Sequence, residues 1–158
     1  MNVLNKKIVF ICIGNSNIIG DCLGPLIGSY IIQNIKDFNK KKLIEVVGTM
    51  ENPIGYNNLD FLEYVKEKNN VYIVIDSALG NKKYIGKIII NSKVLYAGKG
   101  LNKNFIIYGD YIIKGIVGNN FNNKILNLKE LYNVQKSQIE EIANKIIKYI
   151  IPNLLDSI

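Results

Sequence analysis

The chain has 158 residues, of which 48% are hydrophobic and 21% charged, the size and composition of one folded domain. Its net charge is +7, but the basic residues are scattered lysines, and arginine, which is favoured for phosphate and guanine contacts, is absent. We therefore expect no nucleic-acid partner. No apolar run is long enough to cross a bilayer, so we also expect no membrane contact and a cytoplasmic location. The absence of histidine excludes Ser-His-Asp and Cys-His nucleophile systems.

The chain opens with a strand-turn-helix pattern. Residues Lys7–Ile13 are a short, mostly β-branched run, typical of a strand buried on both faces. Gly, Asn and Ser residues at 14–17 then predict a turn. From Leu23 the apolar residues recur at helical spacing, and Pro25 suits the first turn of that helix because its missing N–H costs nothing there.

The same alternation continues to residue 76. Leu43–Gly48 predicts a second strand, Asn57–Lys68 a second helix, and Val71–Ile75 a third buried strand that ends at Asp76. A β-α-β-α-β order with right-handed crossovers favours a parallel, doubly wound sheet, in which the first and third strands are neighbours.

The next stretch has shorter connections. Lys87–Asn91, Asn104–Tyr108 and Asp110–Val117 read as strands, with glycine-rich turns around residues 98–100, and they predict an antiparallel edge. Asn119–Lys124 is a polar loop.

We expect the last element to be an amphipathic helix that packs on the sheet, with an interface to a partner as the alternative. Its apolar residues recur from Ile139 to Ile151, with Asn133 as a cap and Pro152 at its end. The whole chain, 1–158, is therefore expected to form a single α/β domain, a three-layer sandwich around a mostly parallel twisted sheet.

Two acids follow the predicted strands at the edge where such sheets bind ligands. Asp21 follows strand one and Asp76 follows strand three. Two carboxylates in one crevice repel each other, so that one keeps a proton and the pair can act as acid and base. Alternatively the pair could hold a divalent cation, or Asp21 could only cap the helix while Asp76 orders a turn.

Other residues at this edge are candidates for binding substrate. Gly14, Asn15 and Ser16 lie in the turn before the helix, and Asn52 and Asp110 lie on loops expected at the same end of the sheet. The turn is neither a dinucleotide-binding nor a Walker motif, so nucleotide binding is not indicated. Cys12 fits a core position, and the role of Cys22, beside Asp21, stays open.

Four segments in order resemble the YyaC-type sporulation protein family, and this resemblance implies a spore protease. They are Cys12–Gly28, Gly48–Pro53, Ile75–Gly80 and Gly109–Val117, and together they cover nearly the whole chain. More distantly, the pattern resembles the spore germination protease and the hydrogenase maturation proteases. The resemblance implies a phosphorylase/hydrolase-like α/β fold.

The resemblance also implies roles for the two acids. Asp21 and Asp76 match the acids proposed as an unusual aspartic pair in the germination protease, and matching acids bind nickel with a later histidine in the hydrogenase maturation proteases. This chain has no histidine, so that metal site does not carry over intact. Family members also carry a histidine after the Glu/Asp-x-Pro motif, where this chain has Gly55 or a neighbour of it.

Three hypotheses follow. The first is a sporulation-associated endopeptidase, without cofactor or bound metal, whose Asp21 and Asp76 activate water against a peptide bond. Its partners would be peptide or protein substrates such as small spore proteins in the spore-forming cell or forespore, with homo-oligomers expected. The second is a catalytically inactive relative that serves as a binding or regulatory module. The third is a metal-dependent maturation-type peptidase.

Overall fold

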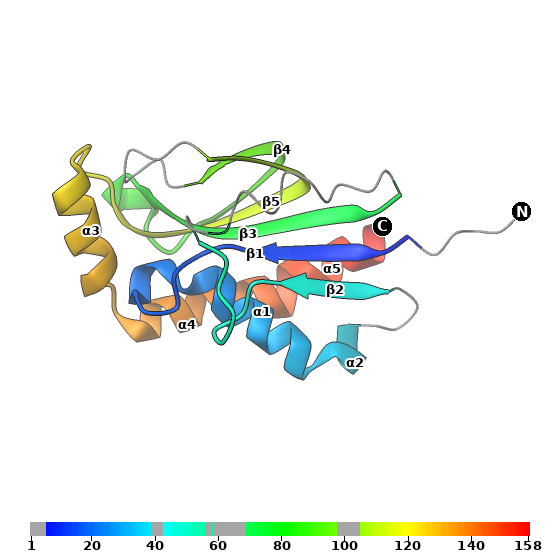
Figure 1. Ribbon diagram of the computed structural model, residues 1–158. Coiled ribbons are helices and arrows are strands. Elements are labelled where there is room, and N and C mark those ends of the chain that lie inside the picture. The colour runs from blue at the N-terminus through cyan, green and yellow to red at the C-terminus, as the bar shows by residue number, and fades with distance from the viewer. Residues whose placement is uncertain (1–5, 39–42, 56–57, 59–68, 98–104) are drawn as a thin grey trace, which may run out of the picture.

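The fold is organised around one five-stranded sheet. The computed structural model describes residues 6–38, 43–55, 58, 69–97 and 105–158 (Figure 1). The strands lie in the order β2-β1-β3-β5-β4. Their bounds are β1 (Ile8–Cys12), β2 (Ile44–Val47), β3 (Val71–Gly80), β4 (Ile88–Ala97) and β5 (Phe105–Asn119). All neighbours pair in parallel except β4, which is antiparallel to β5. The mostly parallel sheet, its antiparallel edge and the adjacency of strands one and three are confirmed.

Helices cover one face of this sheet. The helices are α1 (Leu23–Gln33), α2 (Ile35–Phe38), α3 (Lys124–Asn133), α4 (Lys136–Lys145) and α5 (Ile151–Ser157). Single turns are η1 (Ile19–Asp21), η3 (Lys82–Tyr84) and the π-helical η5 (Ile146–Ile150). In Figure 1, α1, α4 and α5 lie on the same side of the strands, and α3 stands at the end of the sheet. Within the described residues, no helix is long and apolar enough to cross a bilayer.

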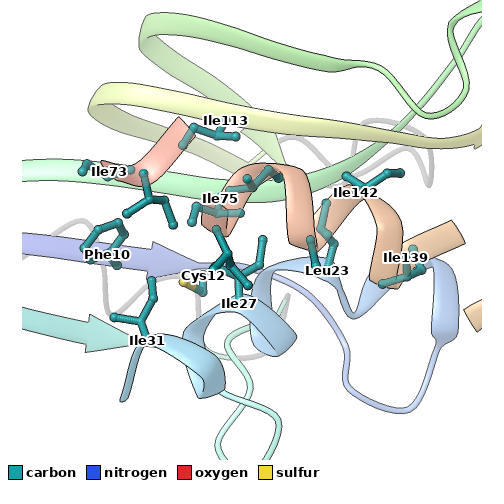
Figure 2. Packing of buried hydrophobic residues seen from close by; sticks show 14 of the residues in the cluster. Phe10, Cys12, Leu23, Ile27, Ile31, Ile73, Ile75, Ile113, Ile139 and Ile142 are labelled. Carbon is teal, nitrogen blue, oxygen red and sulfur yellow. The ribbon is translucent and has the colours of Figure 1, made fainter. Parts of the chain in front are cut away.

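The main core lies between the sheet and these helices. Phe10, Cys12 and Ile75 point from the strands toward Ile27 of α1 and Ile142 of α4 (Figure 2). Their burial follows from the alternation of side chains along each strand, which sends every second residue to this face.

The opposite face of the sheet is buried too. Val9, Ile11, Val74 and Ile112 form a second apolar cluster on that side. Burial on both faces explains why β1 and β3 are continuous apolar runs rather than alternating ones. The helix predicted for Asn57–Lys68 lies outside the described residues, apart from Asn58.

Glycines let α1 approach the strand ends closely. A Cβ on Gly24 would lie 2.3 Å from the Ile13 carbonyl oxygen, and one on Gly28 would lie 2.0 Å from that of Gly48. The first turns of α1 therefore touch the main chain at the carboxyl ends of β1 and β2. This contact fixes the loop that leads into the helix.

Several strand boundaries differ from those predicted, and β4 runs to Ala97 rather than ending at Asn91. The third strand does not end at Asp76, because β3 continues to Gly80 by pairing with β5. Likewise, the described residues of the segments predicted as two strands, Asn104–Tyr108 and Asp110–Val117, belong to the single long strand β5. Strand β4 pairs with both halves of β5, so the two predicted strands form one element.

The C-terminal part also differs. Pro152 does not end the last helix, which runs on as α5 after the π-helical turn η5. A proline has no N–H to donate, and a wider turn before it accommodates the break in the helical ladder. Asn133 is the last residue of α3 rather than a cap, and α4 begins after Gln135. The helix α3 itself was not predicted.

Candidate functional site

The loop between β1 and α1 closes on itself around Asp21. The Asn15 N–H lies 3.0 Å from both the backbone oxygen and the carboxylate Oδ2 of Asp21. The Gly14 N–H donates to the Ile54 carbonyl (2.9 Å), and a Cβ on Gly14 would lie 1.9 Å from the Asp21 oxygen. Gly14 also has a φ of +150°, so only glycine fits this close approach. The loop thus holds Asp21 through main-chain contacts.

Asp21 does not cap the helix. The residue before α1 is Cys22, and no side chain makes a cap hydrogen bond there. Instead, the free side of the Asp21 carboxylate turns toward β3, where the Ser77 hydroxyl donates to its Oδ1 over 3.4 Å. The interpretation of Asp21 as a helix cap is therefore wrong.

Asp76 lies beside this contact, inside strand β3. It is only 7% exposed, and the Ser77 backbone N–H donates to its carboxylate. Because it is a paired strand residue, the interpretation that it orders a turn is also wrong. Ser77 therefore contacts both acids, Asp21 through its hydroxyl and Asp76 through its backbone.

The surroundings raise the pKa of both acids. Burial raises the pKa of Asp21 from 3.8 to about 6, although the hydrogen bonds from Asn15 and Ser77 oppose the rise. Burial raises the pKa of Asp76 well above its ordinary value, and the charge of Asp21 raises it further. The Ser77 N–H and the charge of Lys114 partly offset this. Because the charge of Asp21 raises the pKa of Asp76, Asp76 keeps its proton to a higher pH than Asp21 does.

Ser77 and Lys114 were not singled out from the sequence. Both lie in segments that carry the family resemblance, but their roles depend on the pairing of β3 with β5. Lys114 is the direct partner of Asp76 in that register. Only the register, which the sequence does not state, brings the lysine beside the acid.

The other predicted site residues separate into two groups. Gly14, Asn15 and the half-buried Ser16 lie in the loop that holds Asp21. Asn52 is exposed after the carboxyl end of β2, where its N–H donates to the Thr49 hydroxyl. These four residues share the end of the sheet at which Asp21 lies.

Asp110 lies at the opposite end. Its carboxylate accepts a hydrogen bond from the Tyr72 N–H (2.8 Å), at the start of β3 and four residues before Asp76. At about 3.3 Å per residue, the two acids are separated by about 13 Å along the strand direction. The expectation that Asp110 lies on a loop at the same end is therefore wrong.

The cysteines and acids of the site favour neither metal binding nor a mechanism with a thiolate nucleophile. Burial, and then the charge of Asp21, raises the pKa of the Cys22 thiol, which donates to the Ile19 carbonyl. Cys12 is fully buried, which also raises its pKa. Among the residues that the structure describes, no three His, Cys, Asp or Glu side chains are grouped to bind a metal ion. The donor set does not fit a nickel site.

Comparison with known families identifies the chain's relatives. The family described as "Protein of unknown function (DUF1256)" matches residues 1–149. The chain belongs to this family. It is 30% identical over 142 residues to the "Uncharacterized protein YyaC" of Bacillus subtilis (strain 168), a match that covers 88% of this chain and 64% of that protein. The chain thus spans less than two thirds of the length of this curated relative.

Solved structures share the fold. The [NiFe] hydrogenase maturation protease HybD from Thermococcus kodakarensis superposes with a TM-score of 0.54 at 12% identity, covering 94% of this chain and 99% of HybD. The maturation protease HycI from Thermococcus kodakarensis KOD1 gives 0.50 at 16% identity, covering 96% and 94%. At these identities the likeness shows the α/β fold alone.

Proposed function

We propose that this DUF1256 protein is a peptidase in which Asp21 and Asp76 act together on water and a peptide bond. The observation that carries the proposal is the double role of Ser77, which contacts both acids and keeps them within electrostatic reach of each other. The pair is asymmetric, because Asp76 is buried whereas Asp21 is partly exposed. Such asymmetry separates a proton acceptor from a proton donor.

The two acids divide the reaction between them. The ionised Asp21 accepts a proton from water, whose oxygen forms a bond to the peptide carbonyl carbon, while Asp76 gives its proton to the carbonyl oxygen. In the second step one hydroxyl of the resulting diol returns a proton to Asp76, and the C–N bond breaks. The departing amine takes the proton from Asp21, so both acids regain their starting states.

We place this activity in spore formation. The four segments that resemble the YyaC-type proteins support that setting, with small spore proteins as substrates in the spore-forming cell or forespore. The fold shared with two maturation proteases is consistent with peptide hydrolysis.

Conservative substitutions test the acid pair. Asp21→Asn and Asp76→Asn keep the size of each side chain but remove its acid–base capacity, so we expect each to lower the cleavage rate by about 100-fold or more. Cleavage of purified small spore proteins is followed by mass spectrometry. Asp110→Asn, at the other end of the sheet, is the matched control and should cleave at the wild-type rate. The proposal fails if the wild type cleaves nothing, or if both site variants cleave as fast as it does.

The rate should also depend on pH in a defined way. Since Asp21 must be ionised and its pKa is raised to about 6, the rate should rise as the pH increases through about 6. It should fall again at higher pH, where Asp76 loses its proton. A rate that is flat between pH 4 and pH 7 would contradict the role of Asp21.

A further inference from the structure

A cavity of about 850 Å³ lies beside strand β2. Its lining includes Val46 and Val47 of that strand, Ile32 and Gln33 of α1, and Asn52 of the following loop. Consecutive strand residues point to opposite faces of a sheet, and Val46 and Val47 indeed pack against different core clusters. A cavity that contacts both must therefore wrap around the edge of the strand.

The edge of β2 that the cavity wraps around is the one that faces away from β1. Strand β1 occupies one side of β2, and within the described part of the chain it is the only strand that pairs with β2. The Ile8 N–H donates to the Leu43 carbonyl (2.8 Å), so the main-chain groups of Leu43 point toward β1. Main-chain groups of alternate residues point the same way along a strand. Those of Val46 therefore point outward, into the cavity.

The cavity leads to the acid pair. Ile54 lines it, pairs with Ile13 and accepts the hydrogen bond from Gly14, the first residue of the loop that holds Asp21. In the strand register, Asp76 lies three residues beyond the level of Val46, about 10 Å along the strands, and β3 lies three strand spacings, about 14 Å, from a chain at the outer edge of β2. These two displacements combine to about 17 Å, and because an extended chain advances about 3.3 Å per residue, about five residues span this distance.

We propose that this cavity is the binding cleft for an extended peptide, which adds to the outer edge of β2 as a further strand. The main-chain N–H and C=O of Val46 pair with the peptide backbone, and the aliphatic lining takes an aliphatic side chain of the peptide. A bond about five residues further along the peptide reaches Asp21 and Asp76. Cleavage at that bond rests on the proposed function, whereas binding at β2 does not.

Binding is measured on protein that cannot cleave. The probe is a fluorescein-labelled peptide of alternating valine and threonine with lysines at both ends, titrated by fluorescence anisotropy with the Asp21→Asn, Asp76→Asn double variant. Adding Val46→Pro removes the outward N–H without breaking the ladder to β1, and we expect about tenfold weaker binding from the lost hydrogen bond. Val46→Thr keeps the N–H and the side-chain shape, and it should bind within about threefold of the parent.

Two further measurements distinguish a lost binding contact from misfolding of the Val46→Pro variant. Ile32→Lys, on the exposed surface of α1, leaves the backbone of β2 unchanged but places a charge in the cavity, and it should also weaken binding about tenfold. A probe whose backbone nitrogens are methylated at alternate residues should not bind. The inference is overturned if the methylated probe binds equally well, or if Val46→Pro and Ile32→Lys both bind like the parent.

The outcomes separate this inference from the proposed function. If the probe binds at β2 but the wild type cleaves no peptide, the proposed function fails and the binding cleft stands. If the wild type cleaves small spore proteins and both cleft variants keep the same kcat/KM, the acid pair stands and the cleft is wrong.

Discussion

Replacing Asp21 by asparagine should stabilise the protein at neutral pH while it destroys the proposed site. Folding raises the pKa of Asp21 from 3.8 to about 6, so the folded state holds this proton more tightly than the unfolded chain does. Stability is therefore lost as the pH rises from about 4 to about 6, and the full loss persists above that range. A shift of this size corresponds to about 3 kcal/mol. Removing the Asp21 charge also lowers the pKa of Asp76, because that charge is one of the causes that raise it.

Urea unfolding followed by circular dichroism measures this effect. At pH 8 we expect the free energy of unfolding of Asp21→Asn to exceed that of the wild type by up to about 3 kcal/mol, and we expect the difference to disappear near pH 4. An asparagine oxygen can still accept the hydrogen bond from the Asn15 N–H. Asp156→Asn, which changes an exposed acid on α5, should show no such pH-dependent difference. If Asp21→Asn is no more stable than the wild type at pH 8, the proposed electrostatic environment is wrong.

Two further substitutions test the geometry of the site and its placement. Gly14→Ala should cost several kcal/mol in thermal unfolding, because its Cβ would collide with the Asp21 oxygen, whereas Gly86→Ala, also at positive φ but in open space, should cost only about 1 kcal/mol. Asp110→Ala should lower stability by about 1–3 kcal/mol, since it removes the hydrogen bond between the Asp110 carboxylate and the Tyr72 N–H, and it should leave the cleavage rate unchanged. A cleavage rate that falls in Asp110→Ala while the protein remains folded would contradict the position of the site.

The sequence predicts the parallel half of the fold well, because its strands are buried on both faces. An uninterrupted apolar run such as Ile8–Cys12 is compatible with few structures other than a buried strand, and the helical spacing after Leu23 predicts a helix equally clearly. The adjacency of β1 and β3 then follows from the order of the elements. Asp21 and Asp76 could be paired as candidates on this basis alone.

The missed features depend on contacts between distant segments. Asp76 looked like the end of a strand because an acid seldom continues a buried run, but the Ser77 N–H and Lys114 accommodate it within β3. Helix α3 was missed because most of its apolar residues face outward, with Ile125 68% exposed and Tyr132 55% exposed, and Leu131 alone among them is buried, which is too little for a helical stripe.

Strand β3 also limits how the gene can change in length. Its pairing with β5 shifts register between Ala78 and Leu79, two residues beyond Asp76. Deleting one codon before Asp76 would exchange the faces of Asp76 and Ser77 and separate the two acids. Beyond the shift, an irregular pairing is already present, so insertions and deletions there leave the acids in place. Length variation among related genes should therefore be concentrated after Ala78 and be rare between Val71 and Asp76.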